Sequence, residues 1–264
     1  MNISLIKYNL KKDSYKNILV IAVLSIILAI GNINVLSLSS FNNQISLSDI
    51  FINIFGGSPY DVQIEEKLIL FLQWFFPHML ILYLINIYIS NKLIDDMIII
   101  LPRLKSKIKW MFTVDLSLIL IIIKYYIVMF FTYGIFSYIF MGRRIFDNSD
   151  FKLILSIIIL SILMCISFIV ALINLNIIFS RNSIANIIFF MLIIISSFID
   201  YSNKTFLKSI LINNAMIVRH SIFYNIHNFT VNYSIVYFVC FILVNVIISF
   251  LLVNKLDMKR LKIF

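Results

Sequence analysis

Runs of apolar residues long enough to cross a lipid bilayer recur along this chain of 264 residues, and they constrain its fold more than any other feature. A bilayer core of about 30 Å needs roughly 20 apolar residues in an α-helix. Hydrophobic residues make up 62% of the chain and charged residues 13%, too little polar surface for a soluble domain of this size. We therefore predict an all-α, multi-pass membrane protein with a single domain, residues 1–264. Six transmembrane helices are expected at about residues 18–38, 68–90, 113–140, 152–179, 183–200 and 232–254.

The basic residues are distributed unevenly between the segments that connect these expected helices. Segments 1–17, 91–112, 180–182 and 255–264 hold 14 of the 22 lysines and arginines but only 4 of the 12 acidic residues. Loops rich in Lys and Arg stay on the cytoplasmic side of a membrane, so both termini are predicted to be cytoplasmic. The net charge of +10 then reflects topology and attraction to anionic lipids. We expect no nucleic-acid partner.

Two segments are too polar to span the membrane but carry apolar residues at helical spacing. Residues 1–17 contain four lysines beside a narrow stripe formed by Ile3, Ile6 and Leu10. This pattern predicts a helix on the cytoplasmic interface, with a loose basic tail as the alternative. Residues 201–231 repeat apolar side chains at roughly helical spacing. We expect two short re-entrant helices that enter the outer leaflet partly, with a surface loop as the alternative.

The connection between the second and third expected helices, residues 91–112, carries a dense cluster of basic residues. Two aspartates precede an apolar run, a proline and a series of lysines and an arginine. A structured basic bend in the cytoplasm indicates contact with a soluble partner. We call residues 91–112 the elbow. The side chains expected to contact the partner are Asp95, Asp96, Leu101, Pro102, Arg103, Lys105, Lys107 and Trp110.

The chain lacks the motifs of the enzyme classes that its composition allows. No glycine has the spacing of a nucleotide-binding P-loop, so we expect no nucleotide hydrolysis by that route and no cofactor in this chain. Glu65 and Glu66 resemble the paired glutamates of membrane proteases, but Leu70 stands where an arginine is required. His220 and His227 would share one helical face, yet interfacial histidines are a simpler interpretation than a metal site.

His78 and Lys124 fall inside expected spans, where ionisable residues are costly and commonly functional. His78 follows Pro77, and a hydrogen bond to a carbonyl freed by the proline is one expectation for it. The stem of Lys124 could extend to the cytoplasmic interface. The alternative for both His78 and Lys124 is that they line a substrate path.

The order of these features resembles the permease subunit of type-2 ABC exporters. That family has six spans, an interfacial helix before the first, a coupling helix between the second and third, and a re-entrant pair between the fifth and sixth. Residues 2–16, 91–112 and 201–231 occupy these places. Within the elbow, Asp95-Asp96, the apolar run to Leu101, Pro102 and the following basic residues keep the family's order, without its usual Gly-Thr and with a shorter interval.

The resemblance implies a permease in the bacterial plasma membrane that works as a dimer with an identical or related second permease. Two separate ATPase subunits would bind ATP and magnesium, and the elbow would transmit their movement. The substrate would be amphipathic: a peptide, an antimicrobial or a lipid. The Phe55-Gly56-Gly57 loop and the Trp74-x-x-Pro77 pattern also resemble permeases found near peptide-antibiotic loci in low-GC Gram-positive bacteria. An alternative is a stand-alone immunity or sensor protein that sequesters a peptide without ATP.

Overall fold

All regular structure in the described part of the chain is helical. The structure, a computed structural model, describes residues 3–12, 15–39, 46–60, 62–89, 106–141, 148–179, 182–198, 207–223 and 229–255. The helices are α1 (Ile3–Lys12), α2 (Tyr15–Ser39), α3 (Leu47–Phe55), α4 (Ile64–Tyr88), α6 (Lys107–Met141), α7 (Asn148–Phe179), α8 (Asn182–Phe198), α10 (Leu211–Ala215), the 3-10 helix η3 (Ile217–Arg219) and α11 (Val231–Lys255).

Five of these helices, α2, α4, α6, α7 and α11, are long and apolar enough to cross a membrane. This confirms the all-α class and supports a multi-pass membrane protein. The fifth expected span coincides with α8, whose 17 residues extend only about 25 Å at 1.5 Å per residue. That length is slightly less than a typical hydrocarbon core, so a sixth span remains a prediction, as does the side on which the termini lie.

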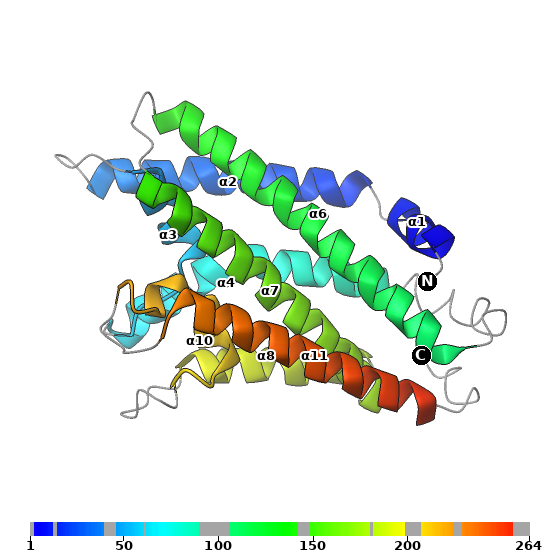
Figure 1. Ribbon diagram of the computed structural model, residues 1–264. Helices are drawn as coiled ribbons and strands as arrows, with labels where there is room; N and C mark the ends of the chain where they lie inside the picture. Colours follow the sequence, from blue (N-terminus) through cyan, green and yellow to red (C-terminus); the bar gives the residue numbers. More distant parts are fainter. Residues whose placement is uncertain are drawn as a thin grey trace.

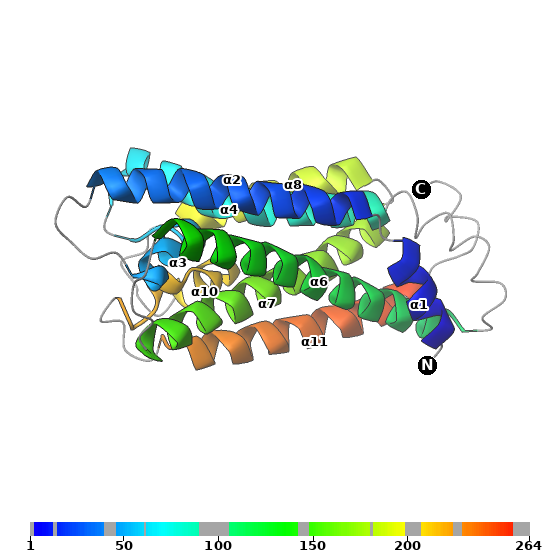
Figure 2. The same ribbon diagram turned by 90° about the horizontal axis from the view of Figure 1, so that it is seen from above.

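The six longer helices of the described part run along a common direction, and the chain reverses between successive ones (Figures 1 and 2). We call the end where α4 stops and α6 begins the elbow end; α1 and the last turn of α11 lie there too. The opposite end, which holds α3, α10 and η3, is the cap end. The elbow segment therefore follows one long helix and precedes another at the end where α1 also lies.

Helices α6 and α7 form the centre of the bundle. In the most apolar stretch of each, 56% of the residues are buried, against 11% in α11. The outer face of α11 is therefore available to lipid or to another subunit. At the cap end the core is aromatic: Phe55 of α3 packs edge-on against Phe130 and Tyr133 of α6, with ring centroids 4.8 and 5.0 Å away. Such pairs add to the stabilisation from burial alone.

The N-terminal amphipathic segment is a helix, as predicted, and it contacts protein. Ile6 and Asn9 of α1 are buried. The Asn9 amide donates to Ser117 Oγ of α6 at 3.1 Å, and the Tyr88 hydroxyl of α4 donates to the Asn9 carbonyl at 2.8 Å. These bonds attach α1 to the ends of the two helices that flank the elbow. Its depth relative to a membrane surface remains a prediction.

Candidate functional site: a cap cluster, a buried core and a lateral groove

Arg219, in η3, is completely buried at the cap end and is bound by groups from several segments. Its Nε donates to the Ser58 carbonyl at 2.7 Å and its Nη2 to Ser58 Oγ at 2.9 Å. Nη1 donates to Asn213 Oδ1, and Nη2 also reaches the Ser197 carbonyl of α8 at 3.4 Å. The guanidinium lies over the Tyr60 ring, 4.7 Å from its centroid. We call Arg219 and these four partners the cap cluster.

The glycine pair before Ser58 lets the loop approach the 216–218 segment closely. Gly57 has a φ of +95°, a conformation that favours glycine. A Cβ at Gly57 would collide with the Met216 side chain, and one at Gly56 would collide with the Ile52 carbonyl. The Val218 amide donates to the Gly56 carbonyl at 3.2 Å. The segment that packs onto this loop thus explains why both positions hold glycine.

In its described part, the predicted re-entrant segment contains the short α-helix α10, followed by the 3-10 helix η3. Every residue from 212 to 220 is buried, and α10 contacts α7, α8 and α11. A surface loop therefore does not describe this part of the chain. Whether it enters a lipid leaflet remains a prediction. The apolar helix α3 is likewise packed into the bundle, against α7.

His220 is buried beside the cap cluster. Its Nδ1 lies 3.0 Å from the Met216 carbonyl and its Nε2 lies 2.8 Å from Ser234 Oγ of α11. The ring stacks on Phe229, with centroids 4.6 Å apart. Among the described residues, no three His, Cys, Asp or Glu side chains are grouped closely enough to hold a metal ion. His220 therefore connects η3 to α11. His227 lies outside the described residues.

Burial lowers the pKa of His220 to about 4, against the effect of its carbonyl neighbours. The unfolded histidine, with a pKa of about 6.5, binds a proton first. The contribution of neutral His220 to the stability of the cap end is therefore expected to be fully present above pH ~6.5 and to be lost as the pH drops towards ~4.

Amide hydrogen exchange of residues 212–223 at pH 7 and pH 5, corrected for intrinsic rates, measures this loss of stability. H220Q, which does not titrate, should lose no protection; equal protection of the wild type at both pH values would contradict the expectation.

His78 is enclosed at the centre of the bundle and does not bond to a freed carbonyl, contrary to that sequence expectation. Its Nδ1 lies 2.8 Å from the Tyr126 hydroxyl of α6, which lies near the Cys165 thiol of α7. The ring is 5.1 Å from that of Trp74. Three helices therefore meet through polar groups at this level. His78 Nε2 is buried without a hydrogen-bond partner.

Lys124 lies on a different side of α6 from the His78 contact. Its ammonium group is 5.5 Å from the centroid of the Tyr125 ring, and the Tyr125 hydroxyl accepts from Asn17 of α2 at 3.0 Å. Residues two apart on a helix do not share a face, so Lys124 and Tyr126 point in different directions. The structure does not bring His78 and Lys124 together. A role of either residue in a substrate path remains a prediction.

Most of the elbow lies outside the described residues. This applies to Asp95, Asp96, Leu101, Pro102, Arg103 and Lys105. Lys107 and Trp110 are described, and they belong to the first turn of α6, which begins six residues before the expected span. Lys107 is partly exposed, whereas Trp110 is buried in the bundle core. Trp110 therefore anchors the start of α6 to protein, and what the elbow contacts remains a prediction.

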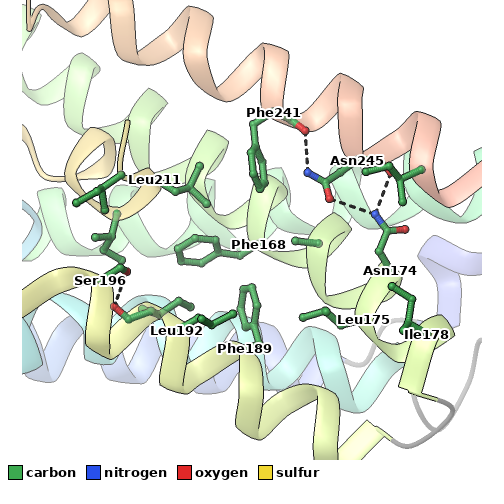
Figure 3. Close-up of a pocket in the computed structure, with 15 residues that line it drawn as sticks. Phe168, Asn174, Leu175, Ile178, Phe189, Leu192, Ser196, Leu211, Phe241 and Asn245 are labelled. Carbon is green, nitrogen blue, oxygen red and sulfur yellow. Dashed lines mark hydrogen bonds between the residues drawn. The ribbon is translucent and has the colours of Figure 1, made fainter. Parts of the chain in front are cut away.

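A groove of about 520 Å³ lies between α8 and α11, with α7 as its floor and residues 210–212 at one side (Figure 3). Phe168 of α7 and Phe189 of α8 meet edge-on inside it, 5.3 Å between centroids. Leu192 and Ile178 on its rim are 57% and 55% exposed. In a membrane this rim would be available to lipid or to another subunit. The groove thus offers an apolar site of ordinary ligand size that opens sideways.

The polar groups of the groove bond to one another. The Asn174 amide of α7 donates to the Asn245 carbonyl at 3.0 Å and to its Oδ1 at 3.2 Å (Figure 3). Ser249 Oγ donates to Asn174 Oδ1 at 2.6 Å. Because these side chains form hydrogen bonds with one another, the walls of the groove favour an apolar ligand. The asparagine amides provide one position at which a polar group of the ligand could bind. Sequence reasoning missed this site; two asparagines within very apolar runs were its only signal.

Comparison of the sequence with models of known protein families, with curated proteins and with solved structures finds no match in any of the three. The functional interpretation therefore depends on the geometry described above and on the resemblance in segment order.

Proposed function

We propose that this chain is the permease subunit of an ATP-driven ABC exporter in the cell membrane, and that it moves an amphipathic substrate with a separate ATPase subunit. The observation that carries the proposal is that α4 ends and α6 begins at the end of the bundle where α1 also lies. The elbow connects these two helices along the chain. The ATPase would bind there, and a second permease, identical or related, would complete the complex within lipid.

Helix α6 is suited to carry movement from the elbow to the rest of the bundle. Its 35 residues extend roughly 50 Å, from the elbow end to the aromatic core at the cap end. Side-chain bonds attach α2 to it at successive levels: Asn17 to Tyr125 at 3.0 Å and Asn32 to Tyr133 at 2.7 Å. A displacement of the first turn would therefore shift α2 and α6 together against α7, as in a shear motion between packed helices.

The groove between α8 and α11 is the proposed substrate site. Phe, Leu and Ile side chains provide its walls, and its rim opens towards lipid. An amphipathic peptide or a lipid could place its apolar part there from within the membrane and leave its polar part at the interface. The same groove would serve the alternative function, sequestration of a peptide without ATP. Dependence of transport on ATP separates the two.

Filling the groove is expected to stop transport without unfolding the chain. Ala171→Trp places an indole on the groove floor. The assay is ATP-dependent export of a fluorescent cationic amphipathic peptide, measured as its uptake into inverted membrane vesicles of the native host with and without ATP. The ATP-dependent rate should fall by about tenfold or more. A tenfold change corresponds to only ~1.4 kcal/mol. Ile187→Trp is the matched control, because Ile187 is 62% exposed on α8 and does not line the groove. ATP-dependent export by Ala171→Trp at the rate of the control would contradict the assignment.

A further inference from the structure

Asp115 is a carboxyl group buried inside the bundle without a hydrogen bond. It lies on α6 and is 4% exposed, and neither of its oxygens has a partner. Asn176 on α7 is 6% exposed, and neither atom of its amide has a partner. On α4, the side-chain oxygen of Asn86 is also buried and unbonded. Buried polar groups in folded proteins are nearly always paired, so these three side chains require an explanation.

The helical register places Asp115 and Asn176 on the faces of α6 and α7 that meet at the His78–Tyr126–Cys165 contact. Asp115 is eleven residues from Tyr126 on α6, and Asn176 is eleven residues from Cys165 on α7. Eleven residues return a helix to nearly the same face after about three turns. Because α6 and α7 run in opposite directions, both intervals extend towards the elbow end (Figure 2). Asp115 and Asn176 therefore occupy the elbow-side third of the bundle, on corresponding faces.

None of the described titratable groups near this level forms a hydrogen bond with Asp115. On the helices packed against α6, those at the elbow end whose side chains are described are Lys7 and Tyr8 of α1, Tyr15 and Lys16 of α2, and Tyr83 and Tyr88 of α4, together with Lys107 and Lys109 of α6 itself. Tyr88 donates to the Asn9 carbonyl, and the others are exposed or partly exposed. At this end the described parts of α7 and α11 add amides and hydroxyls only, such as Asn174 and Ser249.

The charge state of Asp115 follows from the hydrogen-bond donors and acceptors that the buried side chains can offer. A carboxylate only accepts hydrogen bonds, whereas a neutral carboxylic acid offers one donor and one acceptor. The amide of Asn176 or Asn86 offers the complementary acceptor and donor. A buried carboxylate without a partner costs several kcal/mol, and a proton removes that cost. We propose that Asp115 is a proton-binding site, occupied when the elbow end of the bundle is closed and emptied when that end opens to water.

Occupancy of this site would bias the conformation of the bundle. A proton on Asp115 stabilises the closed elbow end, because only that state buries the side chain; an open state that hydrates the carboxylate favours loss of the proton. The two equilibria are linked, so proton binding and opening oppose each other. This linkage is a property of the chain itself, and it does not depend on an ATPase or on the substrate.

Infrared spectroscopy of the full chain in lipid nanodiscs at pH 7 tests the proposal. The wild type should show the carbonyl band of a buried neutral carboxylic acid, which disappears in Asp115→Asn. Asp150→Asn is the control, because Asp150 lies at the cap end and accepts from Ser48 Oγ at 2.6 Å; its spectrum should keep the band. If Asp115→Asn does not fold, Asp115→Glu should keep the acid and shift the band. A wild type without the band, or a band that both Asp115 variants leave unchanged, would overturn the proposal.

Hydrogen exchange measures the linkage to opening. In the wild type, residues 107–118 should exchange faster at pH 9 than at pH 7 after correction for intrinsic rates, because loss of the proton opens the elbow end. Asp115→Asn, an isostere of the neutral acid, should show the same slow exchange at both pH values. Exchange in this segment that rises equally in both proteins would also overturn the proposal.

Discussion

Arg219→Met is expected to lower the free energy of unfolding by about 3–5 kcal/mol, the largest effect of any single substitution considered. The guanidinium is completely buried and donates to Ser58, Asn213 and Ser197. Methionine fills much of the volume but leaves these acceptors buried without that donor. Denaturant titration of the purified chain in detergent measures the change, and exchange of residues 207–223 shows whether the cap end unfolds first.

Ser58→Ala is the matched control for the cap cluster. It removes the hydroxyl that accepts from Nη2, but the Ser58 carbonyl still accepts from Nε. We expect a loss of only about 1 kcal/mol. An Arg219→Met protein within ~1 kcal/mol of the wild type would show that the cap cluster does not hold the cap end together, whatever its geometry.

The triple variant Arg103→Glu, Lys105→Glu, Lys107→Glu is expected to abolish association with the ATPase and with it ATP-dependent export. Facing like charges cost several kcal/mol in an interface, and this variant reverses three of them within five residues. Co-purification of the ATPase from the native host, measured by quantitative immunoblotting or mass spectrometry, provides the readout. A loss of about a hundredfold in the affinity for the ATPase corresponds to only ~2.8 kcal/mol.

The control carries the same change in net charge on the C-terminal tail, in the variant Lys255→Glu, Lys259→Glu, Lys262→Glu. These residues also belong to a segment predicted to be cytoplasmic, so both variants perturb the topology signal to a similar extent. The tail variant should keep the ATPase. Equal retention of the ATPase by the elbow and tail variants would contradict the coupling role of the elbow.

The sequence predicted the long helices well because a membrane-spanning helix depends on the apolar composition of about 20 consecutive residues. The expected spans at 152–179 and 232–254 became α7, Asn148–Phe179, and α11, Val231–Lys255. The third span was expected to begin at about residue 113, with Lys107 and Lys109 assigned to the elbow, whereas the structure includes both lysines in α6. The backbone and side chain of Ser106 accept bonds from the amides of Trp110 and Lys109 at 3.3 and 3.4 Å, so the helix begins directly after it.

The cap cluster and the groove could not be predicted from the sequence, since both depend on contacts between distant segments. Ser58 and Arg219 are 161 positions apart, and Asn174 and Asn245 are 71 apart. Their residue types, small polar groups and one arginine, are typical of loops as well as of buried clusters. The Phe55-Gly56-Gly57 loop was noted in the sequence, but only the structure shows that Met216 packs against Gly57.

His78 illustrates the same limit for a single residue. The sequence identified it as a costly ionisable group inside a span, which the structure confirms by its complete burial. The partner was wrong because proline chemistry suggested a carbonyl on the same helix. The Tyr126 hydroxyl lies 48 positions away along the chain and reaches His78 only when α4 and α6 pack together.

The central claim is that this chain depends on a separate ATPase, and the mass of the intact complex tests it most directly. The full-length chain should be purified from its native host in mild detergent, and the particle mass measured by native mass spectrometry. The claim predicts particles with two membrane subunits of this size class, 30.9 kDa for this chain, and two ATPase subunits that hydrolyse ATP. Particles that contain this chain alone, with no ATPase activity and no change on addition of ATP, would contradict it.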